Sequence, residues 1–175
     1  MTLEPVTRAL DAAAVPYALI GAHAMAARGY PRFTTDIDLL TTDTRVLDAA
    51  LWIPIIEGGA LVDRRRGDDD DPLAGVARIV LTDGTNIDVV VGRWTWEREL
   101  VGRAERMTVL GVTIGVPSTS DLILLKLAAG GHLDLHDAAA LLALGERERV
   151  IADVEARLDD VRPDVRTLWR DLLGG

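Results

Sequence analysis

The spacing of hydrophobic positions changes near residue 118. Before that point, short apolar runs alternate with glycine, proline and charged residues, a pattern typical of strands and tight turns. After it, apolar residues recur every three to four positions, which predicts consecutive helices at about 119–129, 132–144, 146–158 and 163–173. The order predicts a small sheet followed by a helical segment.

The first part of the chain also contains helical patterns, so the predicted class is α/β. Helices are expected at 4–14, 22–28, 45–51 and 93–103, and strands at 17–20, 37–40, 76–81 and 86–91, with a hairpin over 107–116. The dipeptide Asp83-Gly84 predicts a tight hairpin turn between two of the strands. We predict a small mixed sheet flanked by helices over 1–117, with a helical segment, 118–175, packed on it in one domain.

Residues 57–75 are rich in Gly, Arg and Asp and are expected to form a loop. Within it, Arg64-Arg65-Arg66 is interpreted as a solvated charge cluster, with contact to phosphates of a nucleotide or acceptor as the alternative. Trp52, Trp94, Trp96 and Trp169 are expected in the core or at an interface.

Composition narrows the class of protein. The 175 residues are 49% hydrophobic and 27% charged, a globular profile. Neither a signal peptide nor an apolar run long enough to span a membrane is present, so we expect a cytoplasmic protein without a membrane partner. Absence of cysteine excludes disulfides and thiolate metal sites. A net charge of −9 disfavours nonspecific nucleic-acid binding, but a local basic cleft for an RNA end stays open.

Paired carboxylates are the first candidate chemistry. On a strand, Asp36 and Asp38 project to the same face. Two ionised carboxylates held close repel each other unless a cation lies between them, and oxygen ligands suit Mg²⁺ or Mn²⁺. A solvated edge strand or turn is the alternative, since Asp-x-Asp is common there.

Asp88 strengthens the metal hypothesis. It interrupts the apolar run Ile87-Asp88-Val89-Val90-Val91, where an unpaired carboxylate would cost several kcal/mol. If its strand lies next to that of Asp36 and Asp38, it completes a three-carboxylate site. The alternative is an Asp at the strand entrance that accepts hydrogen bonds from turn amides.

The ordered set of motifs resembles a known superfamily. A glycine followed by a helix at Gly21-Ala22-His23, then Arg32-Phe33-Thr34-Thr35-Asp36-Ile37-Asp38, then the isolated Asp88, is similar to nucleotidyltransferases of the DNA polymerase beta type. The lysine helix 121–130 followed by Asp134 and Asp137 resembles the compact bacterial AbiEii-type members associated with toxin–antitoxin systems. The resemblance covers about residues 17–142.

This resemblance implies a metal-dependent transfer of a nucleoside monophosphate from a nucleoside triphosphate to an acceptor hydroxyl. Asp36, Asp38 and Asp88 are then the catalytic and Mg²⁺- or Mn²⁺-binding residues. The nucleotide-binding set implied by the motifs is Gly21, Ala22, Arg32, Thr35, Lys126 and Asp134. The family usually has Gly or Ser after the first glycine, so Ala22 removes a serine hydroxyl contact to phosphate.

Lys126 is the only lysine among 19 basic residues, which suggests a position where arginine does not substitute. It lies in an apolar helix, so its ammonium must either reach solvent or meet an anion. His132 and His136 have the spacing of a zinc site, but the glutamate of the protease motif is missing, which makes that interpretation poor.

Two questions about function stay open. The acceptor is an RNA end, a protein or a small hydroxyl compound, and a cognate toxin or antitoxin is a candidate partner. The alternative to an enzyme is a non-catalytic protein of the same fold that binds a partner, as an antitoxin does. Retention of all three acidic positions favours catalysis.

Overall fold

A mixed five-stranded sheet is the centre of the protein in the computed structural model, which describes residues 2–174. The strands run in the order β1-β2-β5-β4-β3. Their bounds are β1 (Ala18–Ile20), β2 (Asp36–Thr41), β3 (Leu61–Arg66), β4 (Leu73–Val80) and β5 (Asn86–Gly92). Strands β2 and β5 are parallel and the other neighbours are antiparallel. The predicted α/β class with a small mixed sheet is confirmed.

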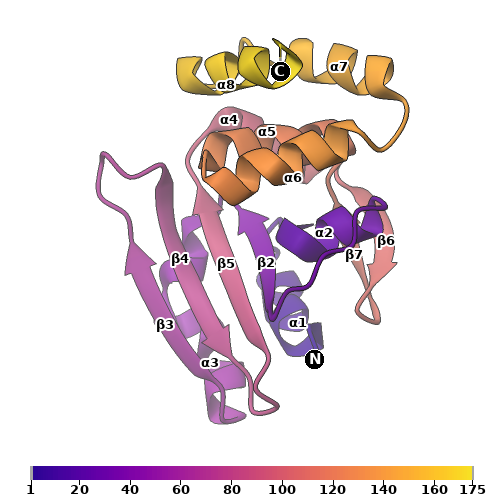
Figure 1. Ribbon diagram of the computed structural model, residues 1–175. Helices are drawn as coiled ribbons and strands as arrows, with labels where there is room; N and C mark the ends of the chain where they lie inside the picture. The colour runs from indigo at the N-terminus through magenta and orange to yellow at the C-terminus, as the bar shows by residue number, and fades with distance from the viewer. Residues whose placement is uncertain (1, 175) are drawn as a thin grey trace.

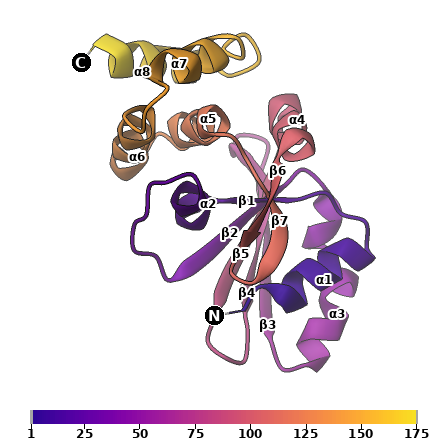
Figure 2. The ribbon, with the colours of Figure 1, turned by 90° about the vertical axis from the view of Figure 1, so that its right-hand side faces the viewer.

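Helices surround this sheet unevenly (Figures 1 and 2). The elements outside the sheet are α1 (Glu4–Ala12), α2 (Gly21–Ala27), the 3-10 helix η1 (Thr44–Leu47), α3 (Ala49–Glu57), α4 (Thr95–Arg103), the hairpin β6 (Glu105–Val109) and β7 (Val112–Val116), α5 (Thr119–Ala129), α6 (His132–Leu142), α7 (Arg147–Glu155) and α8 (Pro163–Gly174). Helices α1 and α3 cover one face of the sheet. Helices α5 and α6 lie across one end of it, with α7 and α8 outermost.

Alternation along the strands separates an apolar face from a polar one. Ile37, Leu39, Ile87, Val89 and Ile79 are fully buried. Because successive side chains on a strand point to opposite faces, the residues between them, among them the candidate carboxylates, point to the other face. That face is the front of Figure 1 and is only partly covered by helices.

Two elements of the first half differ from the sequence expectation. The helix expected at 45–51 is instead the short η1 followed by α3, which continues to Glu57 with Pro54 inside it. The loop expected over 57–75 contains β3 and the start of β4. Strand β3 is at the edge of the sheet, where charged side chains face solvent on a regular strand.

The second half follows the prediction closely. Ser118 begins α5 as its N-cap and accepts a hydrogen bond from the backbone N–H of Asp121. The hairpin turn between β6 and β7 places Leu110 and Gly111 at positive φ, as a tight turn requires. Trp52, Trp96 and Trp169 are buried in the core, whereas Trp94 is 41% exposed and lies outside it. Within residues 2–174, each helix is too short or too polar to cross a membrane.

Candidate active site

The register of the two parallel strands brings the carboxylates together. Asp38 on β2 is paired with Asp88 on β5, and Asp36 is paired with Asn86. Residues paired in register on neighbouring strands project to the same face, and so do residues two apart on one strand. Asp36, Asp38 and Asp88 therefore share one face, and the interpretation of Asp88 as a residue of the strand entrance is wrong.

The charge on Asp38 is unfavourable in this position. Burial is the main cause that raises the pKa of Asp38, to about 6, and the neighbouring charges of Asp88 and Asp36 raise it further. Lys126 and Arg32 act in the opposite direction and do not cancel the effect. The ionised form of Asp38 is thus disfavoured by its surroundings.

Asp88 has a counter-charge of its own. Arg78 on β4 is directly opposite Asp88. Its Nε donates to Oδ1 of Asp88 over 2.9 Å and its Nη2 donates to Oδ2 over 2.8 Å. The side chain of Asp88 is 19% exposed and that of Arg78 is 62% exposed. Arg78 is a residue of the site that the sequence did not single out.

Gly21 leaves room for Asp38. It starts α2 directly after β1 with φ +65°, a left-handed conformation that favours glycine. A Cβ atom at this position would lie 2.1 Å from Oδ2 of Asp38. Any side chain at residue 21 would therefore displace the carboxylate. The resemblance assigns Gly21 to phosphate binding, and the structure shows a second reason for glycine here.

Lys126 meets anions and does not reach out to solvent. Its Nζ lies 2.8 Å from Asp134 Oδ1 and 2.9 Å from Asp137 Oδ2, and only 13% of its side chain is exposed. Asp137 is fully buried and also lies 3.5 Å from Nε of Arg32. Asp137 belongs to the motif that carries the resemblance, but its burial has no signal in the sequence, because an Asp in an Ala-rich helix is placed inside only by its partner lysine. The cluster ties α5 and α6 to the segment between α2 and β2.

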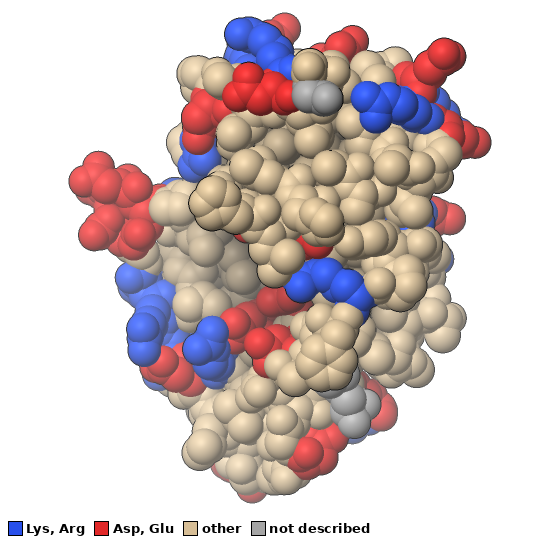
Figure 3. All heavy atoms as spheres, in the orientation of Figure 1, with Lys and Arg blue, Asp and Glu red and all other residues tan. Residues whose placement is uncertain are grey.

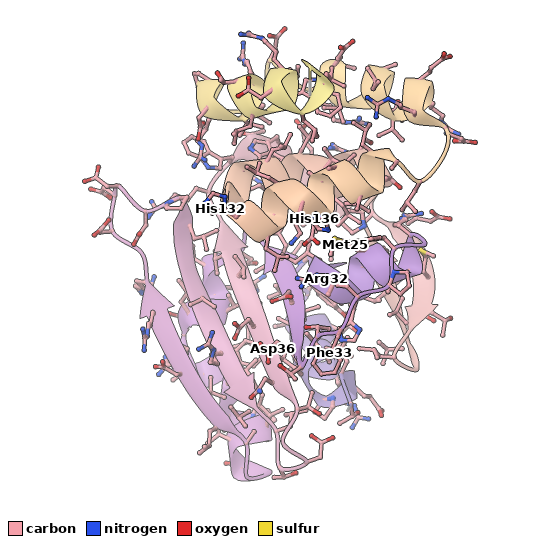
Figure 4. All side chains as sticks on the ribbon, viewed as in Figure 1. Met25, Arg32, Phe33, Asp36, His132 and His136 are labelled. Carbon is pink, nitrogen blue, oxygen red and sulfur yellow. The ribbon has the colours of Figure 1, made fainter. Side chains whose placement is uncertain are left out.

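That segment, residues 28–35, holds the entrance to β2. Thr34 Oγ1 accepts a hydrogen bond from the N–H of Asp36 over 3.2 Å, and Thr35 Oγ1 donates to Asp36 Oδ1 over 3.2 Å. Figure 4 shows Arg32 pointing towards the underside of α6 while Phe33 lies beside Asp36. Phe33 is 87% exposed, an unusual position for an aromatic ring.

A cavity of about 450 Å³ opens between the sheet and the helical segment. Its charged lining residues are Asp38, Lys126, Asp134, Glu97 and Arg162, and Gly21 also lines it. The rest of its wall is largely apolar and comes from strands β2, β4 and β5 and from helices α4, α5 and α8. Its volume is in the usual range for a small-molecule site with a few convergent polar groups.

The surface around the carboxylates is charged although the chain as a whole is acidic. Figure 3 shows acidic side chains gathered in a hollow on the open face of the sheet, with basic side chains on both sides of it. Arg65 and Arg78 lie on strands next to this hollow, on the face that Asp88 shares. The acidic hollow is therefore flanked by arginine side chains.

The carboxylates of Asp36, Asp38 and Asp88 are chemically suitable ligands for a divalent metal ion. The three side chains offer carboxylate oxygens only, which suits Mg²⁺ or Mn²⁺. Among residues 2–174, no three Asp, Glu or His side chains already surround a common point as a metal centre. The carboxylate of Asp88 instead lies against Arg78.

Comparison with solved structures identifies the same fold elsewhere. The solution structure of the antibiotic-resistance factor ANT(2'')-Ia matches with a TM-score of 0.56 and 16% identity, over 87% of each chain. The crystal structure of ANT(2'')-Ia in complex with adenylyl-2''-tobramycin matches with a TM-score of 0.52 and 18% identity, over 88% of this chain and 95% of that one. No protein-family model and no curated sequence matches the chain. The likeness to these structures establishes the fold.

Proposed function

We propose that this protein is a metal-dependent nucleotidyltransferase that moves a nucleoside monophosphate from a nucleoside triphosphate to an acceptor hydroxyl. The observation that carries the proposal is the register of β2 and β5, which places Asp38 beside Asp88 and Asp36 on the same face. Asp38 and Lys126 both line the same cavity. The shared fold with ANT(2'')-Ia supports it.

Asp36, Asp38 and Asp88 would hold Mg²⁺ or Mn²⁺, which supplies charge stabilisation for the attacking and leaving oxygens of an in-line displacement. Asp88 Oδ would accept the proton of the acceptor hydroxyl, as the resemblance implies. Lys126 would balance the charge that develops on the leaving pyrophosphate. Because Lys126 is shared between Asp134 and Asp137, it is held in position before the substrate arrives.

The cavity offers a place for the nucleoside. Its apolar wall includes Trp94, Leu40 and Val90, surfaces against which a base and a ribose can pack. We propose that the triphosphate lies near Gly21 and Lys126, which both line the cavity. Positioning of this kind supplies much of the acceleration in a transfer between two bound reactants.

The acceptor and the biological setting are further parts of the proposal. The ANT(2'')-Ia complex contains a nucleotide-modified small molecule, adenylyl-2''-tobramycin, so in that protein the fold accommodates a small hydroxyl compound. The AbiEii-type resemblance favours a toxin–antitoxin setting with an RNA end or a protein as acceptor. Both settings require the same carboxylates and the same triphosphate cavity.

The proposal is tested by asking which acceptor becomes labelled by a radiolabelled nucleotide. Purified protein is incubated with each radiolabelled ribonucleoside triphosphate and Mg²⁺ or Mn²⁺, with total RNA, cell lysate or a panel of aminoglycosides as acceptor. The expected result is label on one class of acceptor with release of pyrophosphate. A protein that binds no triphosphate and labels none of these acceptors would contradict the proposal.

A further inference from the structure

Arg78 lies in the same row of residues as two of the candidate carboxylates, on the open face of the sheet. The register joins Asp38 on β2, Asp88 on β5 and Arg78 on β4 in one row across three adjacent strands. All three side chains project to the same face. The guanidinium of Arg78 therefore reaches the carboxylate of Asp88 from the side opposite to Asp38.

The contact uses both oxygens of Asp88. Nε and Nη2 of Arg78 donate to Oδ1 and Oδ2, at 2.9 Å and 2.8 Å. Such a two-point contact is stronger and more directional than a single hydrogen bond. A guanidinium is always charged in proteins, so Arg78 is a permanent cation beside Asp88. A divalent ion would have to bind oxygens that are already engaged by a cation.

The Arg78–Asp88 pair lies nearer the surface than another ion pair of the protein. Arg103 binds Asp121 at 2.6 Å, and Asp121 is only 1% exposed and lies in the first turn of α5, so that pair is partly within the core. Arg78 is 62% exposed, and its long side chain is free to turn into solvent. The Arg78–Asp88 pair is thus at the surface of the site and can open without exposing core.

We propose that Arg78 is a built-in counter-cation of Asp88, which a divalent metal ion has to displace before the three-carboxylate site is complete. The inference rests on the proposed function and adds a positioning residue that controls metal affinity. In the absence of metal, Arg78 neutralises Asp88 and fixes its carboxylate. Metal binding releases the guanidinium, which stays on the face that the acceptor approaches.

The test measures Mn²⁺ affinity without any substrate. Free Mn²⁺ is followed by electron paramagnetic resonance during titration of the wild type and of Arg78→Gln, Arg65→Gln, Asp88→Asn and the double variant Arg78→Gln/Asp88→Asn. Arg65 is the matched control, because it is an exposed arginine on the same face that pairs with Asp63 and not with Asp88. Circular dichroism and urea unfolding establish that each variant is folded.

The expected result is that Arg78→Gln binds Mn²⁺ about three- to tenfold more tightly than the wild type, since a partly exposed two-point ion pair competes with the metal to about that extent. Arg65→Gln changes the affinity by less than about twofold, because that charge acts only at a distance in water. In the Asp88→Asn background, removal of Arg78 has no further effect, because the coupling between the two residues is gone.

Two results would overturn the inference. One of them leaves the proposed function standing, and the other contradicts it as well. If the wild type binds Mn²⁺ and Arg78→Gln binds it equally or more weakly, Arg78 does not compete, and the proposed function stands. If the wild type and every variant fail to bind Mn²⁺, the three-carboxylate metal site fails, and the proposed function fails with it. An Arg78→Gln variant that does not fold is replaced by Arg78→Lys, for which the same tightening, of smaller size, is expected.

Discussion

Replacement of Gly21 by alanine tests whether the absence of a side chain at residue 21 is needed to hold the carboxylate of Asp38 in place. Gly21 has φ +65°, and an added Cβ would lie 2.1 Å from Oδ2 of Asp38 and 2.9 Å from its Cγ. An L-residue in the left-handed region costs about 1–2 kcal/mol. The carboxylate must also move by roughly 1 Å, and a misplacement of that size can cost about a hundredfold in turnover.

Gly84 provides the matched control for the strain alone. It has φ +81° in the turn between β4 and β5, with no atom within 4 Å of an added Cβ. Gly84→Ala and Gly21→Ala are therefore both expected to lose about 1–2 kcal/mol of unfolding free energy in urea titrations. Only Gly21→Ala is expected to lose Mn²⁺ affinity, by at least about tenfold, together with nucleotide transfer. Equal Mn²⁺ affinity and transfer in the two variants would refute the placement of Asp38 beside Gly21.

Two further predictions concern buried charge. Because the pKa of Asp38 is raised to about 6, its ionisation opposes folding increasingly from about pH 4 to pH 6 and fully above that. The unfolding free energy of Asp38→Asn minus that of the wild type should thus be about 1–3 kcal/mol more favourable at pH 8 than at pH 4. A difference in urea unfolding that is the same at both pH values would contradict this. Lys126→Ala should destabilise the protein by about 3 kcal/mol, because fully buried Asp137 loses its nearest cation. Adding Asp137→Asn should restore part of that loss in urea unfolding, and a double variant less stable than Lys126→Ala would contradict the pairing.

Periodicity predicted the elements that bury one regular face. The helices after Ser118 and the hairpins at Asp83-Gly84 and Leu110-Gly111 agree with the structure because local residues determine them. The errors lie where tertiary contacts override local preference. The helix expected at 45–51 is replaced by one that starts later and continues through Pro54 to Glu57. Residues 61–66, which lie within the expected loop, form an edge strand that pairs with β4.

The candidate site was predictable in its carboxylates and less so in their surroundings. An Asp within the apolar run 87–91 has a local signal, and register then placed it beside Asp38. Arg78 has no such signal, and Asp137 was noted only through the resemblance, because each is important through a partner on another element. Arg78 depends on the pairing of β4 with β5, and Asp137 on the packing of α6 against α5.

The most direct measurement of the central claim compares nucleotide transfer by the wild type and Asp38→Asn. Asn preserves the size of the side chain and removes the charge that holds a divalent ion. Both proteins are incubated with each labelled ribonucleoside triphosphate, Mg²⁺ or Mn²⁺, and RNA, protein and aminoglycoside acceptors. We predict transfer with pyrophosphate release by the wild type, and loss of nearly all turnover in a variant that remains folded. Transfer by the variant at the wild-type rate, or no transfer by the wild type while a partner protein co-purifies with both, would contradict the assignment of these carboxylates to catalysis.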